Sequence, residues 1–304
     1  MSAISVHNVS KSYGEILALN NLSFSIEDGE LFGLIGPDGA GKSTLFRILT
    51  TLLIADKGEA YVAGHHVVDD YKSIRQKVGY MPGRFSLYQD LSVEENLSFF
   101  ATIFRTTIEE NYHLVKDIYV QLEPFKTRPA GKLSGGMKQK LALCCALIHK
   151  PEVLFLDEPT TGVDAVSRVE FWDMLKSLKE KGIAILVSTP YMDEASLCDR
   201  IALIQDGNIL KIDKPQHMIR DFDKPLFAVT TSETYKVLKF LRNAQFTASA
   251  LPFGSSIHLT TSFPVKPSEI KHYVERTGIP VDDVSPVEAT IEDVFLELSN
   301  KKTI

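Results

Sequence analysis

The fold of this chain is decided by the stretch Gly36-Pro37-Asp38-Gly39-Ala40-Gly41-Lys42-Ser43-Thr44. The apolar residues 31–35 precede it and predict a buried parallel strand. Apolar residues at the spacing of one helix face follow it, at Leu45, Ile48, Leu49 and Leu52. A strand, a glycine-rich loop and a helix in this order are the setting in which the pattern G-x-x-x-x-G-K-S binds phosphate groups. The stretch therefore predicts an α/β fold with a nucleotide site at the end of a strand.

Each part of this loop has an expected role in binding ATP and Mg²⁺. The backbone N–H groups of the loop are expected to surround the phosphates, and the helix N-terminus adds partial positive charge. Lys42 is expected to reach the β- and γ-phosphates, and the Ser43 hydroxyl to ligate Mg²⁺. The predicted ATP-binding residues of the loop are Gly36, Pro37, Asp38, Gly39, Ala40, Gly41, Lys42, Ser43 and Thr44. The alternative, a glycine-rich turn that binds nothing, agrees poorly with the strand and the helix beside it.

The composition of the chain disfavours several other classes of protein. Its 304 residues leave room for one large domain and a smaller one, and the formal charge of −6 gives no general attraction to nucleic acid. The cysteines Cys144, Cys145 and Cys198 do not have the spacing of a metal site. No apolar run approaches the ~20 residues that span a bilayer, and the first residues lack the pattern of a signal peptide. We therefore expect a cytoplasmic protein that reaches a membrane only through another chain.

A second glycine-rich helix start occurs at Leu133-Ser134-Gly135-Gly136. Serine is a preferred N-cap residue, so Ser134 is expected to begin a helix. Because glycine has no side chain, Gly135 and Gly136 leave the N-terminus of that helix accessible to an anion. The sequence thus predicts two helix N-termini that can face phosphate.

The residues expected to hold the metal and to activate water follow a buried strand over residues 153–156. In α/β nucleotide-binding folds the carboxyl ends of parallel strands lie beside the phosphate-binding loop. Asp157 is therefore expected to hold Mg²⁺ together with Ser43, and Glu158 to polarise the attacking water. The alternative, a solvated pair of carboxylates at a strand end, fits poorly after so apolar a strand.

Two regions around the loop predict contacts with the base and with another molecule. Residues 2–30 predict β structure, with Tyr13 in a loop where its ring can stack on a nucleotide base. Residues 83–125 predict a mostly helical insertion. Ser92 and Glu95 have the spacing of a capping box at the start of one of its helices.

The chain changes character near residue 220, and we expect a boundary between two domains there. Residues 1–220 carry all the nucleotide motifs, whereas residues 221–304 predict a small α+β domain. Its elements follow the order β-α-β-β-α-β, the ferredoxin-like arrangement. A last helix follows, with Thr290 and Asp293 as its capping pair.

Together these motifs resemble the ATP-binding subunits of ABC transporters over roughly residues 2–215. The phosphate-binding loop, the signature Leu133–Gly136 and the strand that ends in Asp157 and Glu158 occur in the order typical of that family. The segment Gly162-Val163-Asp164 is similar to the family's D-loop. Residues 290–298 are similar to the tails of exporter subunits that partner the ABC-2 group of membrane proteins.

The resemblance implies a P-loop NTPase fold of the ABC ATPase type, with a mixed core sheet, an antiparallel β-subdomain and a helical insertion. It implies that two cassettes face each other, with each ATP held between one P-loop and the other cassette's signature. Ser134, Gly135 and Gly136 would then act on the partner's nucleotide, and Asp164 would lie at the nucleotide site as well. The helical insertion would contact membrane-spanning permease subunits.

This sequence departs from the pattern of the family at three positions. Gly83 stands where the family usually has a glutamine that contacts Mg²⁺ and water, and Pro190 stands where a histidine usually steadies the γ-phosphate. Asp38 stands where asparagine is common. Loss of one preorganised donor typically costs ~10²–10³ in rate. Because Glu158 is retained, we expect a weakened ATPase site.

Three functions follow from this pattern, and one is favoured. An ATPase subunit of an exporter, forming a pair with a different cassette, agrees with a weak site beside an intact signature. A nucleotide-binding switch that does not hydrolyse ATP is the second possibility, favoured by Gly83 and Pro190. An ABC ATPase that acts on nucleic acid or ribosomes is the third, but the chain lacks the basic surfaces and long coiled coils of that class.

Overall fold

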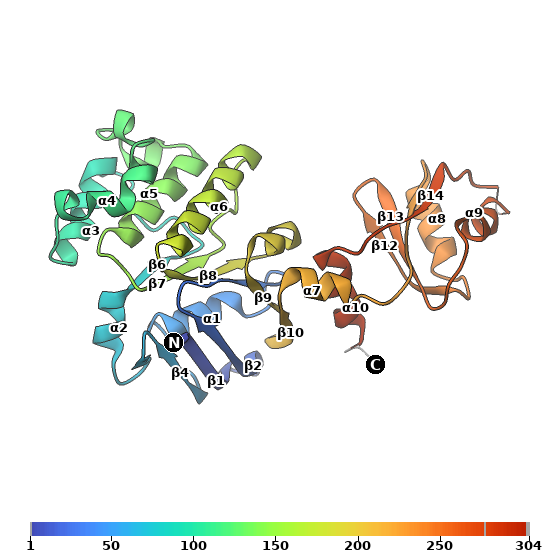
Figure 1. Cartoon of the computed structure of the whole chain (residues 1–304), viewed down its shortest axis with the longest axis horizontal. Coiled ribbons are helices and arrows are strands. Elements are labelled where there is room, and N and C mark those ends of the chain that lie inside the picture. Colours follow the sequence, from blue (N-terminus) through green and yellow to red (C-terminus); the bar gives the residue numbers. More distant parts are fainter. Residues whose placement is uncertain (1, 277, 302–304) are drawn as a thin grey trace. The chain divides into compact units, whose positions relative to one another are not determined.

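The computed structural model describes residues 2–276 and 278–301 of the chain. It divides into two compact units, Met1–Pro215 and Gln216–Ile304. Helix α7 (Pro215–Arg220), except for Pro215, falls in the second unit, so this division lies a few residues before the boundary that the sequence predicts near residue 220. The first unit contains two sheets and the helices that surround them (Figure 1).

The larger sheet of the first unit is mixed and has the strand order β10-β9-β3-β8-β7-β6. Its strands are β3 (Leu31–Ile35), β6 (Val78–Met81), β7 (Val153–Asp157), β8 (Ala184–Thr189), β9 (Arg200–Gln205) and β10 (Asn208–Asp213). All neighbours are parallel except β9 and β10, which form an antiparallel hairpin. Strands β3, β7 and β8 are buried along their whole length, as expected of parallel strands covered on both faces.

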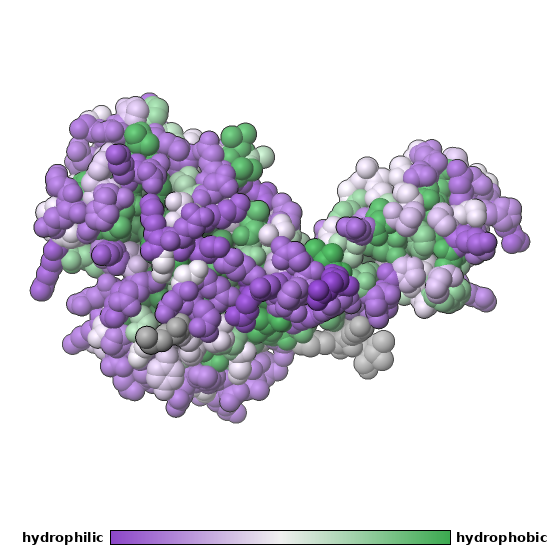
Figure 2. Space-filling view, viewed as in Figure 1, coloured by the Kyte–Doolittle hydropathy of each residue, from purple (hydrophilic) through white to green (hydrophobic). Residues whose placement is uncertain are grey.

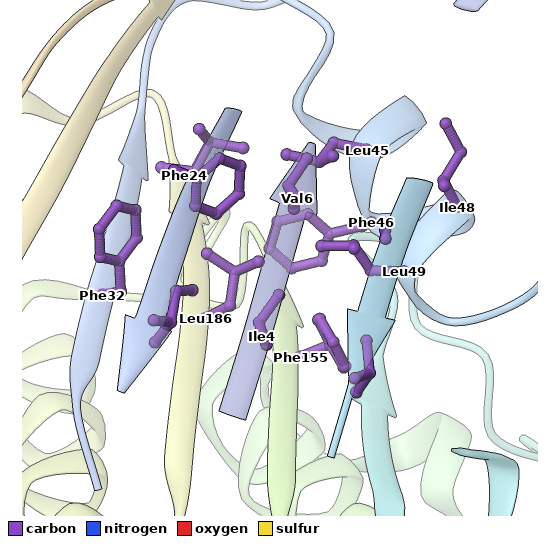
Figure 3. Packing of buried hydrophobic residues seen from close by; sticks show 14 of the residues in the cluster. Ile4, Val6, Phe24, Phe32, Leu45, Phe46, Ile48, Leu49, Phe155 and Leu186 are labelled. Carbon is purple, nitrogen blue, oxygen red and sulfur yellow. The ribbon is translucent and has the colours of Figure 1, made fainter. Parts of the chain in front are cut away.

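The smaller sheet is antiparallel, with the order β2-β1-β4-β5. Its strands are β1 (Ser2–Tyr13), β2 (Ile16–Glu27), β4 (Lys57–Val62) and β5 (His65–His66). Helix α1 (Lys42–Leu49) contacts β7 of the larger sheet and β2 and β4 of this one. Figure 3 shows the resulting core, in which Phe46 of α1 lies near Phe155 with ring centroids 6.0 Å apart. Apolar side chains from both sheets therefore hold α1 in place, and α1 begins at Lys42, the lysine that the sequence predicts to bind phosphate.

The predicted apolar face of α1 is correct for three of its four residues. Leu45, Ile48 and Leu49 are fully buried, whereas Leu52 is exposed. The helix ends at Leu49, and the left-handed backbone of Thr51 (φ 64°) turns the chain away before Leu52.

The remaining helices of the first unit lie around the larger sheet. They are α2 (Tyr71–Lys77), α3 (Val93–Ile103), α4 (Ile108–Tyr119), α5 (Gly135–Leu147) and α6 (Ala165–Glu180), with short 3₁₀ turns η1 (Glu123–Phe125), η2 (Ala130–Lys132) and η3 (Met192–Leu197). Helices α3, α4 and α5 form a group of their own, and α6 runs beside it (Figure 1). Hydrophilic residues cover most of the visible face of this region (Figure 2). The predicted capping box of α3 is confirmed, because Ser92 and Glu95 bond each other's backbone.

The second unit contains a four-stranded antiparallel sheet of order β12-β13-β11-β14. Its elements are β11 (Leu226–Thr230), α8 (Thr234–Leu241), β12 (Thr247–Phe253), β13 (Ser256–Thr261), α9 (Pro267–Glu275), β14 (Asp283–Pro286) and α10 (Ile291–Lys301). Helices α8 and α9 share a core with the sheet. Thr290 and Asp293 cap α10 as predicted, and the other carboxylate oxygen of Asp293 lies 2.7 Å from Nδ1 of His258 on β13. Element order and strand order are those of a ferredoxin-like domain.

Among the described residues, none of the helices has the length and apolar character that crossing a membrane requires.

Candidate functional site

The phosphate-binding loop follows β3 and leads into α1, and the ammonium group of Lys42 is at its centre. Nζ of Lys42 donates to the carbonyl oxygens of Gly36 at 2.8 Å and of Pro37 at 2.9 Å. The same nitrogen lies 3.1 Å from Oε1 of Glu158. Lys42 is only 3% exposed, so its charged group can be contacted only from the adjoining part of the loop. A buried ammonium group held by backbone carbonyls and a carboxylate is well placed to exchange one of these partners for phosphate.

Close contacts with the backbone of neighbouring strands require glycine at two positions of the loop. A Cβ atom on Gly36 would lie 2.1 Å from the carbonyl oxygen of Ile204, and one on Gly41 would lie 2.5 Å from that of Ala18. Gly41 also has φ 104°, in the left-handed region that disfavours other residues. The backbones of β2 and β9 therefore lie in direct contact with the backbone of the loop.

Residues that the sequence analysis missed form this support. The backbone N–H of Gly207, in the turn between β9 and β10, donates to the carbonyl of Ala40 at 3.1 Å, and Asn20 donates to the carbonyl of Gly207 at 2.8 Å. Nothing in the sequence indicates that the turn between β9 and β10 supports the loop.

A first cavity, of about 260 Å³, lies over the loop. It is lined by Tyr13, Ala18, Asp38, Gly39, Gly41, Lys42, Ser43, Thr44 and Glu158. Tyr13 does not lie in a loop as predicted, because β1 continues to this residue and pairs it with Ile16 of β2. Its side chain is 45% exposed, which leaves a face of the ring available for stacking on a base.

A second cavity, of about 530 Å³, adjoins the ends of β6 and β7. It is lined by Ser43, Arg47, Tyr80, Pro82, Gly83, Arg84, Asp157 and Glu158. Ser43 and Glu158 line both cavities, so the two are parts of one site. Burial, and next to it the charge of Asp157, raise the pKa of Tyr80 to about 12, so the tyrosine stays neutral.

The hydroxyl of Ser43 and the carboxylate of Asp157 are the oxygen donors that suit Mg²⁺ in this cavity. Asp157 is 4% exposed, and its Oδ1 accepts a hydrogen bond of 2.6 Å from the hydroxyl of Ser188. This bond orients the carboxylate and leaves its second oxygen for a metal ion. The sequence predicted no role for Ser188.

Glu158 is held in an unusual backbone conformation. Its φ is 51°, in the left-handed region, and its N–H donates to both the carbonyl and the hydroxyl of Ser188, at 3.1 and 3.0 Å. Such a conformation is costly for a residue with a side chain, so two hydrogen bonds hold it here. The arrangement directs the carboxylate of Glu158 towards the loop and Lys42.

Of the two positions with unusual residues, Gly83 lines the second cavity, whereas Pro190 lines neither cavity. A Cβ atom on Gly83 would lie 3.1 Å from the carbonyl oxygen of Asp157, which puts this glycine at the wall of the second cavity. Pro190 follows Thr189, the last residue of β8, and has neither a backbone N–H nor a polar side chain. No glutamine and no histidine lines either cavity among the residues that the structure describes.

The signature residues lie apart from both cavities in this single chain. Ser134 caps α5 by accepting a hydrogen bond of 3.3 Å from the N–H of Met137. A Cβ atom on Gly136 would lie 2.6 Å from Oγ of Ser167, and one on Gly135 would lie 3.1 Å from the carbonyl of Gly162. Both glycines are therefore packed against the D-loop and the start of α6.

Asp164 also lies apart from the two cavities. Its side chain caps α6 by accepting a hydrogen bond of 3.0 Å from the N–H of Ser167. This hydrogen bond lowers the pKa of Asp164. Of the predicted site residues, the two cavities thus bring together Tyr13, Asp38, Gly39, Gly41, Lys42, Ser43, Thr44, Asp157 and Glu158. The others, Gly36, Pro37, Ala40, Ser134, Gly135, Gly136 and Asp164, line neither cavity.

Comparison with known sequences finds relatives in one protein family. The family model described as ABC transporter matches residues 19–161. The chain is 37% identical over 285 residues to the probable multidrug ABC transporter ATP-binding protein YbhF of Escherichia coli (strain K12), a match that covers 92% of this chain and 49% of that protein. It is 32% identical over 305 residues to the Nod factor export ATP-binding protein I of Rhizobium sp. (strain N33), covering 99% and 98% of the two.

Solved structures agree with this grouping. An ATP-binding subunit of an ABC transporter superposes with a TM-score of 0.66 at 26% identity, covering 72% of this chain and 93% of that one. A bacterial ABC transporter cassette solved as a dimer has a TM-score of 0.63 at 29% identity, covering 69% and 98%.

The loop, the two carboxylates and the mixed sheet define a P-loop nucleotide-binding protein with an α/β fold. The comparisons narrow the class: the chain belongs to the family of ABC transporter ATP-binding proteins, and its first unit is an ABC-type ATPase domain that binds nucleotide. The chain spans about half the length of YbhF, one of the relatives that it matches.

Proposed function

We propose that this chain powers export through separate membrane-spanning subunits by binding and hydrolysing ATP with Mg²⁺. The proposal is supported by relatives that are named for multidrug transport and for Nod factor export. The oxygen donors of Ser43 and Asp157 supply a fitting metal site, and Glu158 would orient the attacking water. In this proposal the chain is peripheral on the cytoplasmic face of the membrane, held there by its partners.

We further propose that the chain is the weaker half of an asymmetric pair of cassettes. The observation that carries this proposal is the wall of the second cavity, where Gly83 offers no side chain beside Asp157. Pro190 adds a second position without a donor at the end of β8. Each missing donor would cost ~10²–10³ in rate, yet the carboxylate of Glu158 is in place. Slow rather than absent hydrolysis is therefore expected at this site.

The signature of the chain is intact and lies away from its own P-loop. Its helix N-terminus and the two glycines would complete the nucleotide site of a second, different cassette. ATP would then be held between the two chains, and the second cassette would supply most of the hydrolysis. The dimer of the similar bacterial cassette supports a paired arrangement.

A groove on the first unit supplies a docking surface for the membrane-spanning subunits. It has a volume of about 460 Å³, and its lining includes Phe85, Leu87, Phe100, Ile103 and Phe104. These residues come from helix α3, the residue after it and the segment that follows Gly83. Pro82 and Arg84 line this groove and the second cavity as well, so a partner bound here would lie next to the nucleotide site.

The second candidate function is a nucleotide-binding switch that does not turn over ATP. It is favoured by the ion pair between Lys42 and Glu158, because in this pair the lysine occupies the carboxylate that would orient the attacking water. The two functions differ in one measurable quantity, the rate of phosphate release when the partner cassette and the membrane subunits are present.

The test of the proposed function begins with copurification from membranes under mild detergent, followed by identification of the second cassette and the membrane subunits. Steady-state phosphate release is then measured for this chain alone and for the reconstituted complex. Slow release by the chain alone and much faster release by the complex are expected. Recovery of the chain as a catalytically active homodimer without a second cassette would overturn the asymmetric pair.

A further inference from the structure

A buried carboxylate outside both cavities connects the phosphate-binding loop with helix α6. Glu194, in the 3₁₀ turn η3, is 2% exposed. It accepts a hydrogen bond of 2.5 Å from the hydroxyl of Thr189, and its Oε1 lies 3.1 Å from Nε and 3.0 Å from Nη2 of Arg168. A buried charge is tolerated only where such partners surround it, so Glu194 fixes the positions of the other two residues.

On one side, Thr189 joins this carboxylate to the P-loop. Thr189 is the last residue of β8 and is fully buried. Its carbonyl accepts a hydrogen bond of 3.3 Å from the N–H of Gly36, where the loop begins. Its hydroxyl also accepts from the N–H of Tyr191 at 3.0 Å, which holds the chain on the far side of Pro190.

On the other side, Arg168 joins the carboxylate to the start of α6. Nη2 of Arg168 lies 3.2 Å from Asp193, and its guanidinium group lies 4.6 Å from the centre of the Tyr191 ring. The N–H of Arg168 donates to the carbonyl of Asp164, at the N-cap of the helix. Arginine makes a planar, two-nitrogen contact and stacks on a ring at the same time, which lysine cannot do.

The start of α6 in turn lies against the signature. Ser167 precedes Arg168, and a Cβ atom on Gly136 would lie 2.6 Å from Oγ of Ser167. No side chain separates α6 from α5 at this point, so a displacement of the start of α6 acts directly on the signature helix. Close-packed interiors transmit such displacements because they contain few voids.

We propose that Arg168 and Glu194 are positioning residues that transmit nucleotide binding at this chain's P-loop to its own signature helix. The inference rests on the proposed function, in which that signature completes the site of the second cassette. In this proposal the weak site has a regulatory role. Nucleotide bound there displaces the loop and Thr189. Glu194 and Arg168 couple this displacement to α6, which contacts Gly136. ATP held at the slow site then sets the position of the signature that serves the fast one.

The test uses the full chain and hydrogen exchange, measured by mass spectrometry over residues 134–140. Exchange is compared with and without Mg²⁺ and a slowly hydrolysed ATP analogue, at a concentration where light scattering shows a monomer. A second chain then cannot protect the signature. The variants are Arg168→Ala, Arg168→Lys and Glu194→Gln. Lys176→Ala is the matched control, because Lys176 is a cation of the same helix in an exposed pair with Asp173.

In the wild type and in Lys176→Ala, nucleotide binding is expected to change exchange at residues 134–140. In Arg168→Ala and Glu194→Gln this change should fall at least threefold, while the dissociation constant for the analogue stays within about twofold. Arg168→Lys keeps the charge but not the geometry, so it should lose part of the change, and it serves as the main variant if Arg168→Ala does not fold. A purely structural role would alter exchange equally in the presence and absence of nucleotide.

Two results would overturn the inference and leave the proposed function standing. One is a wild type that binds the analogue without any change at residues 134–140. The other is a nucleotide-dependent change of equal size in the wild type and in the folded variants. Failure of the wild type to bind the analogue at all would instead refute the proposed function, and the inference with it.

Discussion

Nζ of Lys42 lies 3.1 Å from Oε1 of Glu158, so the lysine proposed to bind phosphate and the proposed catalytic carboxylate form an ion pair. With the carbonyls of Gly36 and Pro37, this carboxylate places three oxygen atoms within 3.1 Å of the ammonium nitrogen. We expect phosphate to bind the lysine by replacing one of these partners. Glu158 is the most easily displaced, because it is partly exposed and the two carbonyls are fixed by the loop.

This ion pair predicts that Glu158→Gln strengthens nucleotide binding by the isolated chain. The amide keeps the shape of the side chain but removes the negative charge that competes with phosphate. We expect the dissociation constant for Mg-ATP to fall about threefold to tenfold, which corresponds to ~0.7–1.4 kcal/mol. Calorimetry would measure it, with Glu152→Gln as a control, since Glu152 forms an exposed pair with Lys77. Equal or weaker binding by Glu158→Gln would contradict this reading of the ion pair.

Removal of the lysine itself should have the opposite effect. Lys42→Ala deletes a charge-assisted contact with phosphate, which is worth ~1.5–3 kcal/mol. We therefore expect Mg-ATP to bind roughly 10-fold to 100-fold more weakly. Lys57→Ala, at an exposed position at the start of β4 in the smaller sheet, is the control and should bind normally. Unchanged affinity in Lys42→Ala would refute the assignment of the loop as the phosphate site.

Two glycines of the loop should differ sharply in their tolerance of alanine. Gly36→Ala would bring Cβ to 2.1 Å from the carbonyl of Ile204, a clash that only a shift of the backbone can relieve. We expect a loss of ~3 kcal/mol of stability together with the loss of ATP binding. Gly39 has open space around it and φ 80°, so Gly39→Ala should cost only ~1–2 kcal/mol. Thermal unfolding of both variants measures the difference, and equal destabilisation would contradict the role of the Ile204 contact.

Local patterns in the sequence predicted much of the site, and long-range contacts were missed. The apolar runs before Gly36 and Asp157 identified β3 and β7, because parallel buried strands need apolar side chains on both faces. The roles of Ser188, Gly207 and Arg168 were not predicted, since each is an ordinary residue type whose partner lies far along the chain. Tyr13 was placed in a loop because the end of a hairpin strand has no signal of its own beyond the following glycine.

The packing role of the signature glycines, Gly135 and Gly136, was not predicted from the sequence. Gly135 and Gly136 were read only as residues that bare a helix N-terminus to an anion. In the structure they also allow the D-loop and Ser167 to approach α5 closely. A glycine in the sequence indicates a close approach but does not show whether a ligand or another part of the chain makes it. The close packing against the D-loop and Ser167 is therefore evident only from the fold.

The last prediction concerns the division of labour between the two cassettes of the proposed pair. In the reconstituted complex, Glu158→Gln should lower phosphate release only modestly, because Gly83 in the cavity and Pro190 at the end of β8 offer no side-chain donor and the site is proposed to contribute little turnover. Ser134→Arg should nearly abolish release, because a bulky cation at the N-terminus of α5 blocks the part that completes the other cassette's site. Ser299→Arg, far along the chain in the second unit, serves as the control for added bulk and charge. The measurement is the steady-state rate of phosphate release by the three complexes. Comparable losses of rate in Glu158→Gln and Ser134→Arg would mean that both sites hydrolyse ATP, and this result would refute the asymmetric pair.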